Sequence, residues 1–230
     1  MLLQEALPRY VEAFLRLFYP SRCASCEALL DLDEKGLCSV CTDGFRKLRL
    51  PPSEERIRVA LPPVDEAWAL FPYEGVVKEL LHRVKFGGRR DLLSLFLPEI
   101  KELFHRRPGL SCYEAIVPIP QDTRRRLERE FNQSDLLARE VGGILGKVRE
   151  TSLLKKRATP PQRLLGREER RLNIERAFSI PRPDRATGRS FLLIDDIFTT
   201  GATLEEAARL LKESGAERVG AFVLARTPHR

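Results

Sequence analysis

The chain has 230 residues, of which 43% are hydrophobic and 32% charged, with a formal net charge of +7. This balance excludes extensive disorder and a membrane-embedded protein, and the length allows one α/β domain plus a small module. No apolar run reaches the roughly 20 residues of a spanning helix, and charged residues interrupt the first twenty positions. We therefore expect no membrane span and a cytoplasmic location, with anionic partners favoured by the positive charge.

The first nineteen residues have the periodicity of an amphipathic helix. One face carries apolar side chains at helical spacing, namely Leu3, Leu7, Tyr10, Phe14 and Leu17. Such a stripe usually packs against the same chain. A position on a membrane surface is the alternative, and it is disfavoured because the polar face is not rich in Lys or Arg.

Two Cys-x-x-Cys pairs follow, Cys23 with Cys26 and Cys38 with Cys41. In a cytoplasmic protein this pattern most often indicates tetrahedral zinc, because each pair can supply two thiolates to one ion. Disulfides or a redox pair are the alternatives, and neither fits well without a secretory signal or a βα unit. Four thiolates leave no open position for catalysis, so we expect a structural ion that stabilises the module. Cys112 stands apart, and we expect it to be a small buried apolar residue.

The rest of the chain divides at a proline-rich stretch, which we interpret as a linker over residues 51–66. It would join the helix and zinc module (1–50) to a larger domain (67–230). In that domain helices are expected at 76–84, 92–100, 134–145 (with Ser134 as the cap) and from Leu204 towards Gly215. Strands are expected at 67–73, 115–119, 152–156, 177–180, 191–197 and 219–225. The alternation after residue 113 predicts a doubly wound parallel sheet.

The most informative stretch is Phe191–Leu204, in which a buried apolar strand runs into Asp195 and Asp196 and then into a loop of small and hydroxyl residues before a helix. Its loop residues are Thr199, Thr200, Gly201, Ala202 and Thr203. Open α/β sheets bind ligands at the carboxyl ends of their strands. Backbone N–H groups and the helix N-terminus suit a phosphate monoester, and paired carboxylates suit vicinal hydroxyls. The pattern therefore predicts a site for a ribose 5-phosphate compound.

Three other interpretations fit parts of this stretch. Two acidic residues that end a strand could be a Walker B element, but the chain has no Gly-x-x-x-x-Gly-Lys-Ser/Thr loop. The carboxylates could instead hold a divalent metal ion, or the loop could be capped and bind no ligand. Strand, diacid and loop agree best with the sugar phosphate.

The same motif resembles the phosphoribosyl pyrophosphate (PRPP) signature of type I phosphoribosyltransferases. That resemblance implies that Asp195 and Asp196, the candidate catalytic residues, hold the ribose hydroxyls, and that Thr199–Thr203 hold the 5-phosphate. It also implies Mg²⁺ bound together with PRPP.

The flanking segments resemble the competence protein F (ComF, or GntX-like) family. The resemblance rests on Val117–Pro120, Arg126, Arg129, Phe131-Asn132-Gln133, Thr159, Gln162, Arg167, Arg170, Asn173 and the Leu80–Phe86 helix, with both cysteine pairs in order. It implies an N-terminal zinc segment on a type I phosphoribosyltransferase domain, a role in DNA uptake during natural transformation, and often a homodimer.

An enzyme of this kind would transfer a phosphoribosyl group from PRPP to an acceptor that the sequence does not identify. Basic residues would neutralise pyrophosphate, and the basic segment 155–176 would form a lid. The candidates for these roles are Lys85, Arg124, Arg125, Arg126, Arg129, Thr159, Gln162, Arg170 and Asn173. The alternative is a non-catalytic, PRPP-responsive accessory of the transformation machinery that binds single-stranded DNA and competence proteins.

Overall fold

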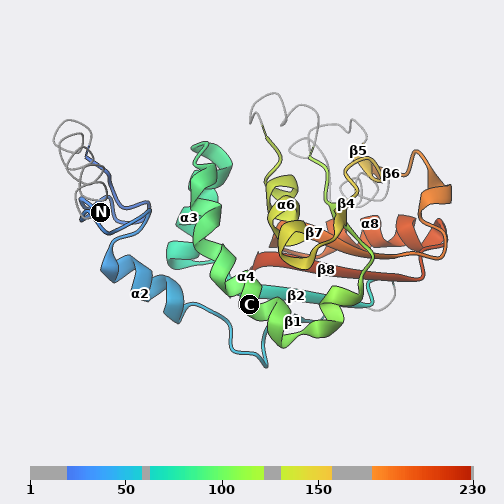
Figure 1. Ribbon diagram of the computed structural model, residues 1–230, viewed down its shortest axis with the longest axis horizontal. Coiled ribbons are helices and arrows are strands. Elements are labelled where there is room, and N and C mark those ends of the chain that lie inside the picture. The colour runs from blue at the N-terminus through green and yellow to red at the C-terminus, as the bar shows by residue number, and fades with distance from the viewer. Residues whose placement is uncertain (1–19, 59–62, 122–130, 157–177, 229–230) are drawn as a thin grey trace, which may run out of the picture. The chain divides into compact units, whose positions relative to one another are not determined.

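The computed structural model describes residues 20–58, 63–121, 131–156 and 178–228 (Figure 1). The predicted helix at residues 1–19 lies outside these ranges. Packing divides the chain into two units, of which the smaller contains residues up to 49 and 74–95 and the larger contains 50–73 and 96–230. Within the described ranges, no helix combines the length and the apolar character needed to cross a membrane.

The larger unit is built on a six-stranded sheet with the order β1-β2-β8-β7-β3-β4. Every neighbouring pair is parallel except β1, which pairs antiparallel with β2. The strands are β1 (Arg56–Ile57), β2 (Glu66–Pro72), β3 (Ala115–Pro118), β4 (Val148–Arg149), β7 (Ser190–Phe198) and β8 (Arg218–Arg226). The predicted α/β fold with a mainly parallel sheet is confirmed.

Helices cover both faces of this sheet. They are α4 (Leu97–Arg106), α6 (Gln133–Leu145) and α8 (Ala202–Glu213), with short 3₁₀ helices at Pro108–Cys112 and Pro183–Arg185. Successive side chains of a strand point to opposite faces. On one face of the sheet, Leu193 of β7 belongs to the same core cluster as the apolar side chains of α8. On the other face Ile116 lies beside Gly142 of α6, and the ring of Phe222 meets that of Phe104 of α4 at 5.3 Å.

Two predicted strands of the larger unit have a different role from the one expected. The segments at 152–156 and 177–180 contain β5 (Lys155–Lys156) and β6 (Phe178–Ser179), which pair antiparallel in a separate two-stranded sheet. The residues between them, which include most of the predicted lid, lie outside the described ranges.

The predicted linker at 51–66 differs from the structure because part of it belongs to the sheet. It contributes β1, the fully buried Ile57 and the fully buried Glu55. Glu55 accepts hydrogen bonds from both terminal nitrogens of Arg106 at the end of α4, and Arg107 lies 3.6 Å away. A buried carboxylate paired in this way is part of the core rather than of a flexible connection.

The smaller unit contains α2 (Ser39–Lys47) and α3 (Gly75–Phe86), which pack on each other. We expected helix 76–84 to belong to the larger domain, but packing groups it with the cysteine module. The predicted helix at 92–100 is also different, since a 3₁₀ helix at Arg90–Phe96 is followed by α4. The α-helix begins beside a proline, which is favoured in the first turn because the N–H that proline lacks would have no partner within the helix there.

Candidate functional site

The diacid lies at the edge of the sheet where the parallel strands end. The last residue of β3, Pro118, pairs with Ile194, so β7 continues past β3. On its other side β7 remains paired with β8, from Asp195 opposite Val223 to the end of the strand. The prediction that the diacid sits at the carboxyl edge of the sheet therefore agrees with the strand register.

The loop after β7 requires glycine at one position. Gly201 has φ +86°, a left-handed conformation, and it directly precedes α8. A Cβ on this residue would lie 2.9 Å from Cζ of Phe198. Both the backbone conformation and the contact exclude other side chains without strain. Close packing against the end of its own strand thus fixes the path of the loop.

The first turn of α8 offers unused hydrogen-bond donors. The helix has no side-chain N-cap, and its first backbone bond runs from the N–H of Glu205 to the carbonyl of Gly201. Among the described residues, no backbone carbonyl accepts from the N–H groups of Thr203 or Leu204. The N–H of Ala202, the first residue of the helix, donates to the hydroxyl oxygen of the exposed Thr200 at 3.5 Å. Free amides and the positive end of a helix dipole form an anion-binding arrangement.

Thr227 anchors the start of this loop from the neighbouring strand. Its N–H donates to the carbonyl oxygen of Phe198 at 2.9 Å, and its hydroxyl donates to the backbone carbonyl oxygen of Thr199 at 3.3 Å. These bonds fix the end of β7 against the end of β8, so the loop leaves the sheet at a defined point.

Asp195 is held from inside the fold. Its Oδ1 accepts a 2.7 Å hydrogen bond from the hydroxyl of Ser134 and a 2.9 Å bond from the N–H of Asp196. Burial, and then repulsion from the Asp196 carboxylate, raise the pKa of Asp195 to about 7. The serine and the amide oppose this rise because they donate to the charged form.

The charge of Asp196 raises the pKa of a residue that the sequence analysis missed. Tyr73, directly after β2, has a pKa raised first by burial and then by the negative charge of Asp196. Its N–H donates to the carbonyl oxygen of Arg226 at 2.7 Å. The end of β2 therefore places the Tyr73 hydroxyl close enough to Asp196 to respond to its charge. Tyr73 and Asp196 are far apart in the sequence, so no local sequence pattern predicts this contact.

The segment before α6 positions the diacid, and our prediction that Ser134 caps this helix is wrong. Asn132 is the N-cap, since its side chain accepts from the N–H of Ser134, and it also donates to the carbonyl of Ile119 at 2.9 Å. The buried Gln133 accepts a hydrogen bond from Gln121. One short segment thus connects the end of β3, the start of α6 and the carboxylate of Asp195.

A polar cavity of about 460 Å³ opens beside this segment, between the ends of β3 and β4 and the first turn of α6. Its wall includes an ion pair in which Arg149 Nη1 lies 3.0 Å from Asp135 Oδ1. The predicted pyrophosphate and lid residues Arg124, Arg125, Arg126, Arg129, Thr159, Gln162, Arg170 and Asn173 all lie outside the described ranges. Lys85 is in the last turn of α3, in the smaller unit.

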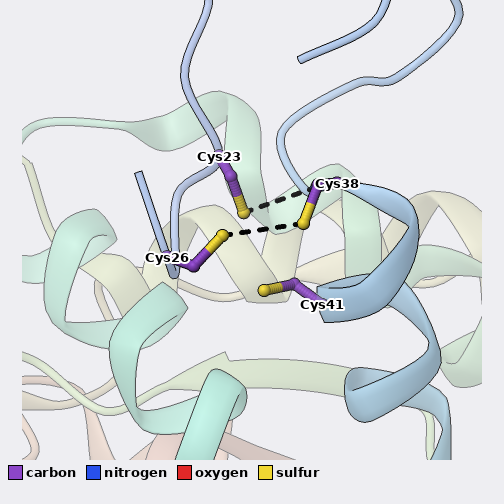
Figure 2. Close-up of side chains that lie close together, drawn as sticks. All are labelled: Cys23, Cys26, Cys38 and Cys41. Atoms are coloured by element: carbon purple, nitrogen blue, oxygen red, sulfur yellow. Dashed lines mark hydrogen bonds between the residues drawn. The ribbon is translucent and has the colours of Figure 1, made fainter. Parts of the chain in front are cut away.

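The four predicted metal ligands come together in the smaller unit (Figure 2). The sulfurs of Cys23, Cys26, Cys38 and Cys41 all lie within 4.8 Å of one another, and those of Cys26 and Cys38 are 3.6 Å apart. Zinc bonds of about 2.3 Å to a tetrahedron of thiolates require sulfur separations of about 3.8 Å. The cluster therefore has the composition and size of a four-thiolate metal site.

Backbone amides support one of these thiolates. The N–H groups of Ser25 and Cys38 each approach Cys23 Sγ at 3.4 Å. Burial raises the pKa of Cys23, but hydrogen bonds from these two amides, from the N–H of Cys26 and from the Cys26 thiol outweigh it and bring the pKa down to about 6. Burial raises the pKa of Cys41, by contrast, to about 12. Amides that favour the thiolate are the outer contacts expected of a metal ligand.

The fifth cysteine does not belong to this cluster. Cys112 is exposed, so our prediction that it is buried is wrong. It ends a 3₁₀ helix, where its Sγ approaches the carbonyl of Pro108 at 3.8 Å. All five cysteines are free thiols, with no disulfide.

The chain is similar in sequence to a phosphoribosyltransferase domain and to proteins of DNA utilization and competence. Residues 137–230 match the family model described as "Phosphoribosyl transferase domain". The DNA utilization protein YhgH of Escherichia coli (strain K12) is 31% identical over 92% of this chain and 99% of its own length. Competence protein F of Haemophilus influenzae is 29% identical over 91% and 98%. A purine phosphoribosyltransferase structure from Pyrococcus horikoshii covers 56% of this chain and 80% of its own, with a TM-score of 0.36 and 14% identity.

Proposed function

Because the chain belongs to the ComF family of proteins with a phosphoribosyltransferase domain, we propose that it binds PRPP at the loop after β7 and acts as a phosphoribosyltransferase-family protein in DNA uptake. One observation carries the proposal. The diacid at the end of β7 is followed within a few residues by a glycine-dependent turn and a helix start with unused N–H groups.

In this proposal the two halves of the site hold different parts of one ligand. The N–H groups of the first turn of α8 and the threonine hydroxyls bind the 5-phosphate, where the helix dipole favours negative charge. The carboxylates of Asp195 and Asp196 accept hydrogen bonds from the ribose hydroxyls. Only two residues separate the diacid from the loop that begins at Thr199, so both halves of the site can reach one small sugar phosphate.

The donor set also fits Mg²⁺ bound together with the diphosphate. Mg²⁺ prefers oxygen ligands and is usually held by one or two carboxylates plus substrate phosphates. Asp195 and Asp196 supply such oxygens. They are only two residues, and in the described ranges only the four cysteines form a group of three or more potential ligands. The ion would therefore arrive with PRPP, and it would neutralise charge on the leaving diphosphate.

We also propose that zinc occupies the four-cysteine cluster in a structural role. Four thiolates complete a tetrahedral coordination shell, so no position remains for a reactive water. The basic residues predicted to meet pyrophosphate, Lys85 and the arginines between β3 and α6, stay part of the proposal, as does the lid at 155–176.

Calorimetric titration with ribose 5-phosphate and with PRPP plus Mg²⁺ tests the binding site directly. We expect both to bind the zinc-loaded protein, and Asp196→Asn to weaken each at least tenfold, since a hydrogen bond to a charged group is lost. Asp184→Asn is the matched control, because it removes an exposed carboxylate paired with Arg182 outside the site. Absence of binding by the wild-type protein contradicts the proposal.

The second candidate function is a non-catalytic accessory that responds to PRPP and binds single-stranded DNA in the transformation machinery. The names of the relatives and the net charge of +7 favour a role with nucleic acid. Salt-dependent binding of single-stranded DNA that is unaffected by Asp196→Asn, together with no consumption of PRPP in the presence of candidate bases, supports this alternative over the enzyme.

A further inference from the structure

The cavity between the ends of β3 and β4 and the first turn of α6 has the size and the lining of a small-molecule site. Its volume of about 460 Å³ lies in the usual range for such sites. Part of its wall is apolar, formed by Pro118, Pro120 and Phe131. Another part is polar, formed by Gln121, Asp135 and Arg149. An apolar wall with a few polar groups suits a ligand that is partly apolar and carries hydrogen-bonding atoms.

The charges in the polar part of the wall cancel. Arg149 Nη1 lies 3.0 Å from Asp135 Oδ1, and the same nitrogen donates to the backbone carbonyl oxygen of Asp135 at 3.3 Å. A diphosphate in this cavity would meet the carboxylate of Asp135, and like charges in contact repel. The cavity therefore favours an uncharged polar ligand over an anion.

Two oxygen atoms of the wall have unused capacity to accept hydrogen bonds. Oδ1 of Asp135 and Oε1 of Gln121 are buried, and neither accepts a hydrogen bond from any described residue. Such acceptors are unfavourable unless a partner supplies N–H groups. Arg149 provides the opposite character beside them, because a guanidinium has five N–H donors and only Nη1 bonds a described residue. The wall thus presents acceptors next to a donor.

We propose that this cavity binds a nucleobase that carries an amino group beside an unprotonated ring nitrogen, as adenine and cytosine do on their Watson–Crick edges. The amino group donates to the oxygens of Asp135 and Gln121, and the ring nitrogen accepts from Arg149. Carboxylate and amide oxygens accept from these amino groups in nucleic-acid recognition as well. Hypoxanthine and uracil reverse both groups on this edge, so acceptor would face acceptor and donor would face donor.

The first turn of α6 connects this cavity to the diacid. Asp135 lines the cavity, and its neighbour Ser134 donates to Asp195 Oδ1 at 2.7 Å. Pro118 also lines the cavity, and in the sheet it pairs with Ile194, the residue before Asp195. A base in the cavity is therefore a neighbour of the proposed ribose. The inference rests on the proposed function in one respect, since it names amino-bearing bases as the acceptor class.

Calorimetry on the full zinc-loaded chain tests the inference with adenine, cytosine, hypoxanthine and uracil, each with and without ribose 5-phosphate. We expect adenine and cytosine to bind at least about tenfold more tightly than hypoxanthine and uracil, respectively. Asp135→Ala should reduce this preference to within about twofold, because it removes one of the two acceptors and the partner that holds Arg149. Glu140→Ala is the matched control, since Glu140 is also in α6, is also 35% exposed and also pairs with an arginine, but does not line the cavity. It should keep the wild-type preference.

A second measurement does not depend on the folding of a variant. A crystal structure of the wild-type protein with adenine should place the amino group within hydrogen-bond distance of Asp135 Oδ1. Because the same edge of a base is open in single-stranded DNA, short deoxyadenylate and deoxythymidylate strands are used as competitors of adenine. Displacement by deoxyadenylate alone identifies DNA as a source of the base, and displacement by neither strand identifies the free base.

The outcomes separate the inference from the proposed function. Equal affinity for amino and oxo bases, no binding of any base, or a preference that persists in Asp135→Ala overturns the inference. A preference that Asp135→Ala removes and Glu140→Ala keeps supports it. If ribose 5-phosphate does not bind but this preference is found, the proposed function fails and the base site stands. If ribose 5-phosphate binds and no base does, only the base site fails.

Discussion

Gly201 and Phe198 lie so close together that a single added carbon at Gly201 would meet Cζ of the phenylalanine at 2.9 Å. The same glycine has a left-handed backbone, with φ +86°. The end of strand β7 thus shapes the loop that follows it. The backbone of the proposed phosphate site depends on this contact together with the hydrogen bonds from Thr227.

Replacing this glycine should therefore damage both stability and binding. Gly201→Ala adds a left-handed alanine, at a cost of about 1–2 kcal/mol, and a steric clash besides. We expect a loss of about 2–4 kcal/mol in urea unfolding and loss of ribose 5-phosphate binding. Gly143→Ala is the control, because this position in α6 has open space, and alanine there should stabilise by about 0.5–1 kcal/mol. Equal effects of the two changes would contradict the account.

The four-cysteine cluster should bind one zinc ion per chain. Cys23→Ser and Cys41→Ser each remove a ligand, so we expect zinc content to fall well below one equivalent and helical circular dichroism to decrease, because the ion stabilises the module that contains α2. Zinc release measured with a chromogenic chelator checks the stoichiometry. Cys112→Ser, which changes an exposed cysteine outside the cluster, should keep the full equivalent; a loss in that variant would argue against this ligand set.

The buried Glu55 should contribute strongly to stability. Glu55→Gln leaves the guanidinium of Arg106 without its buried counter-charge, and breaking such a pair costs about 3–5 kcal/mol. Glu102→Gln is the matched control, as Glu102 pairs with the same arginine at 3.3 Å but is exposed. An exposed i,i+4 pair contributes only about 0.3–0.5 kcal/mol. Urea unfolding that shows equal losses for the two variants would refute a core role for the segment before β2.

Stability should depend on pH through Asp195. Its pKa is about 7 in the fold against an ordinary 3.8, so between these values the folded protein holds a proton that the unfolded chain has released. This contribution therefore falls as pH rises from about 4 to 7 and is absent above pH 7, with a slope of at most about 1.4 kcal/mol per pH unit. Asp195→Asn should lack it, so the stability difference from wild type should change between pH 5 and 7 and level off by pH 8. A difference that is constant across this range would be incompatible with a raised pKa.

Local patterns predicted the parts of the fold that depend on nearby residues. The apolar run before Asp195, the small residues of the loop and the helical spacing after Leu204 report strand, turn and helix directly. The spacing of the cysteine pairs predicted a cluster that the structure forms, since two short loops suffice to bring four sulfurs together.

The remaining features depend on contacts between distant residues. Ser134 and Asp195 are 61 positions apart, and Glu55 and Arg106 are 51 apart, so neither pair leaves a local signal. The prolines at 51–66 were interpreted as a linker because the burial of Glu55 is visible only once α4 is folded. The packing of α3 with α2, and the exposure of Cys112, likewise follow from tertiary contacts rather than from residue type.

The central claim is tested most directly by a crystal structure of the zinc-loaded protein with PRPP and Mg²⁺. We expect the 5-phosphate within hydrogen-bond distance of the N–H groups in the first turn of α8, and the ribose hydroxyls on the carboxylates of Asp195 and Asp196. A phosphate bound elsewhere, with both carboxylates free of the sugar, would contradict the account.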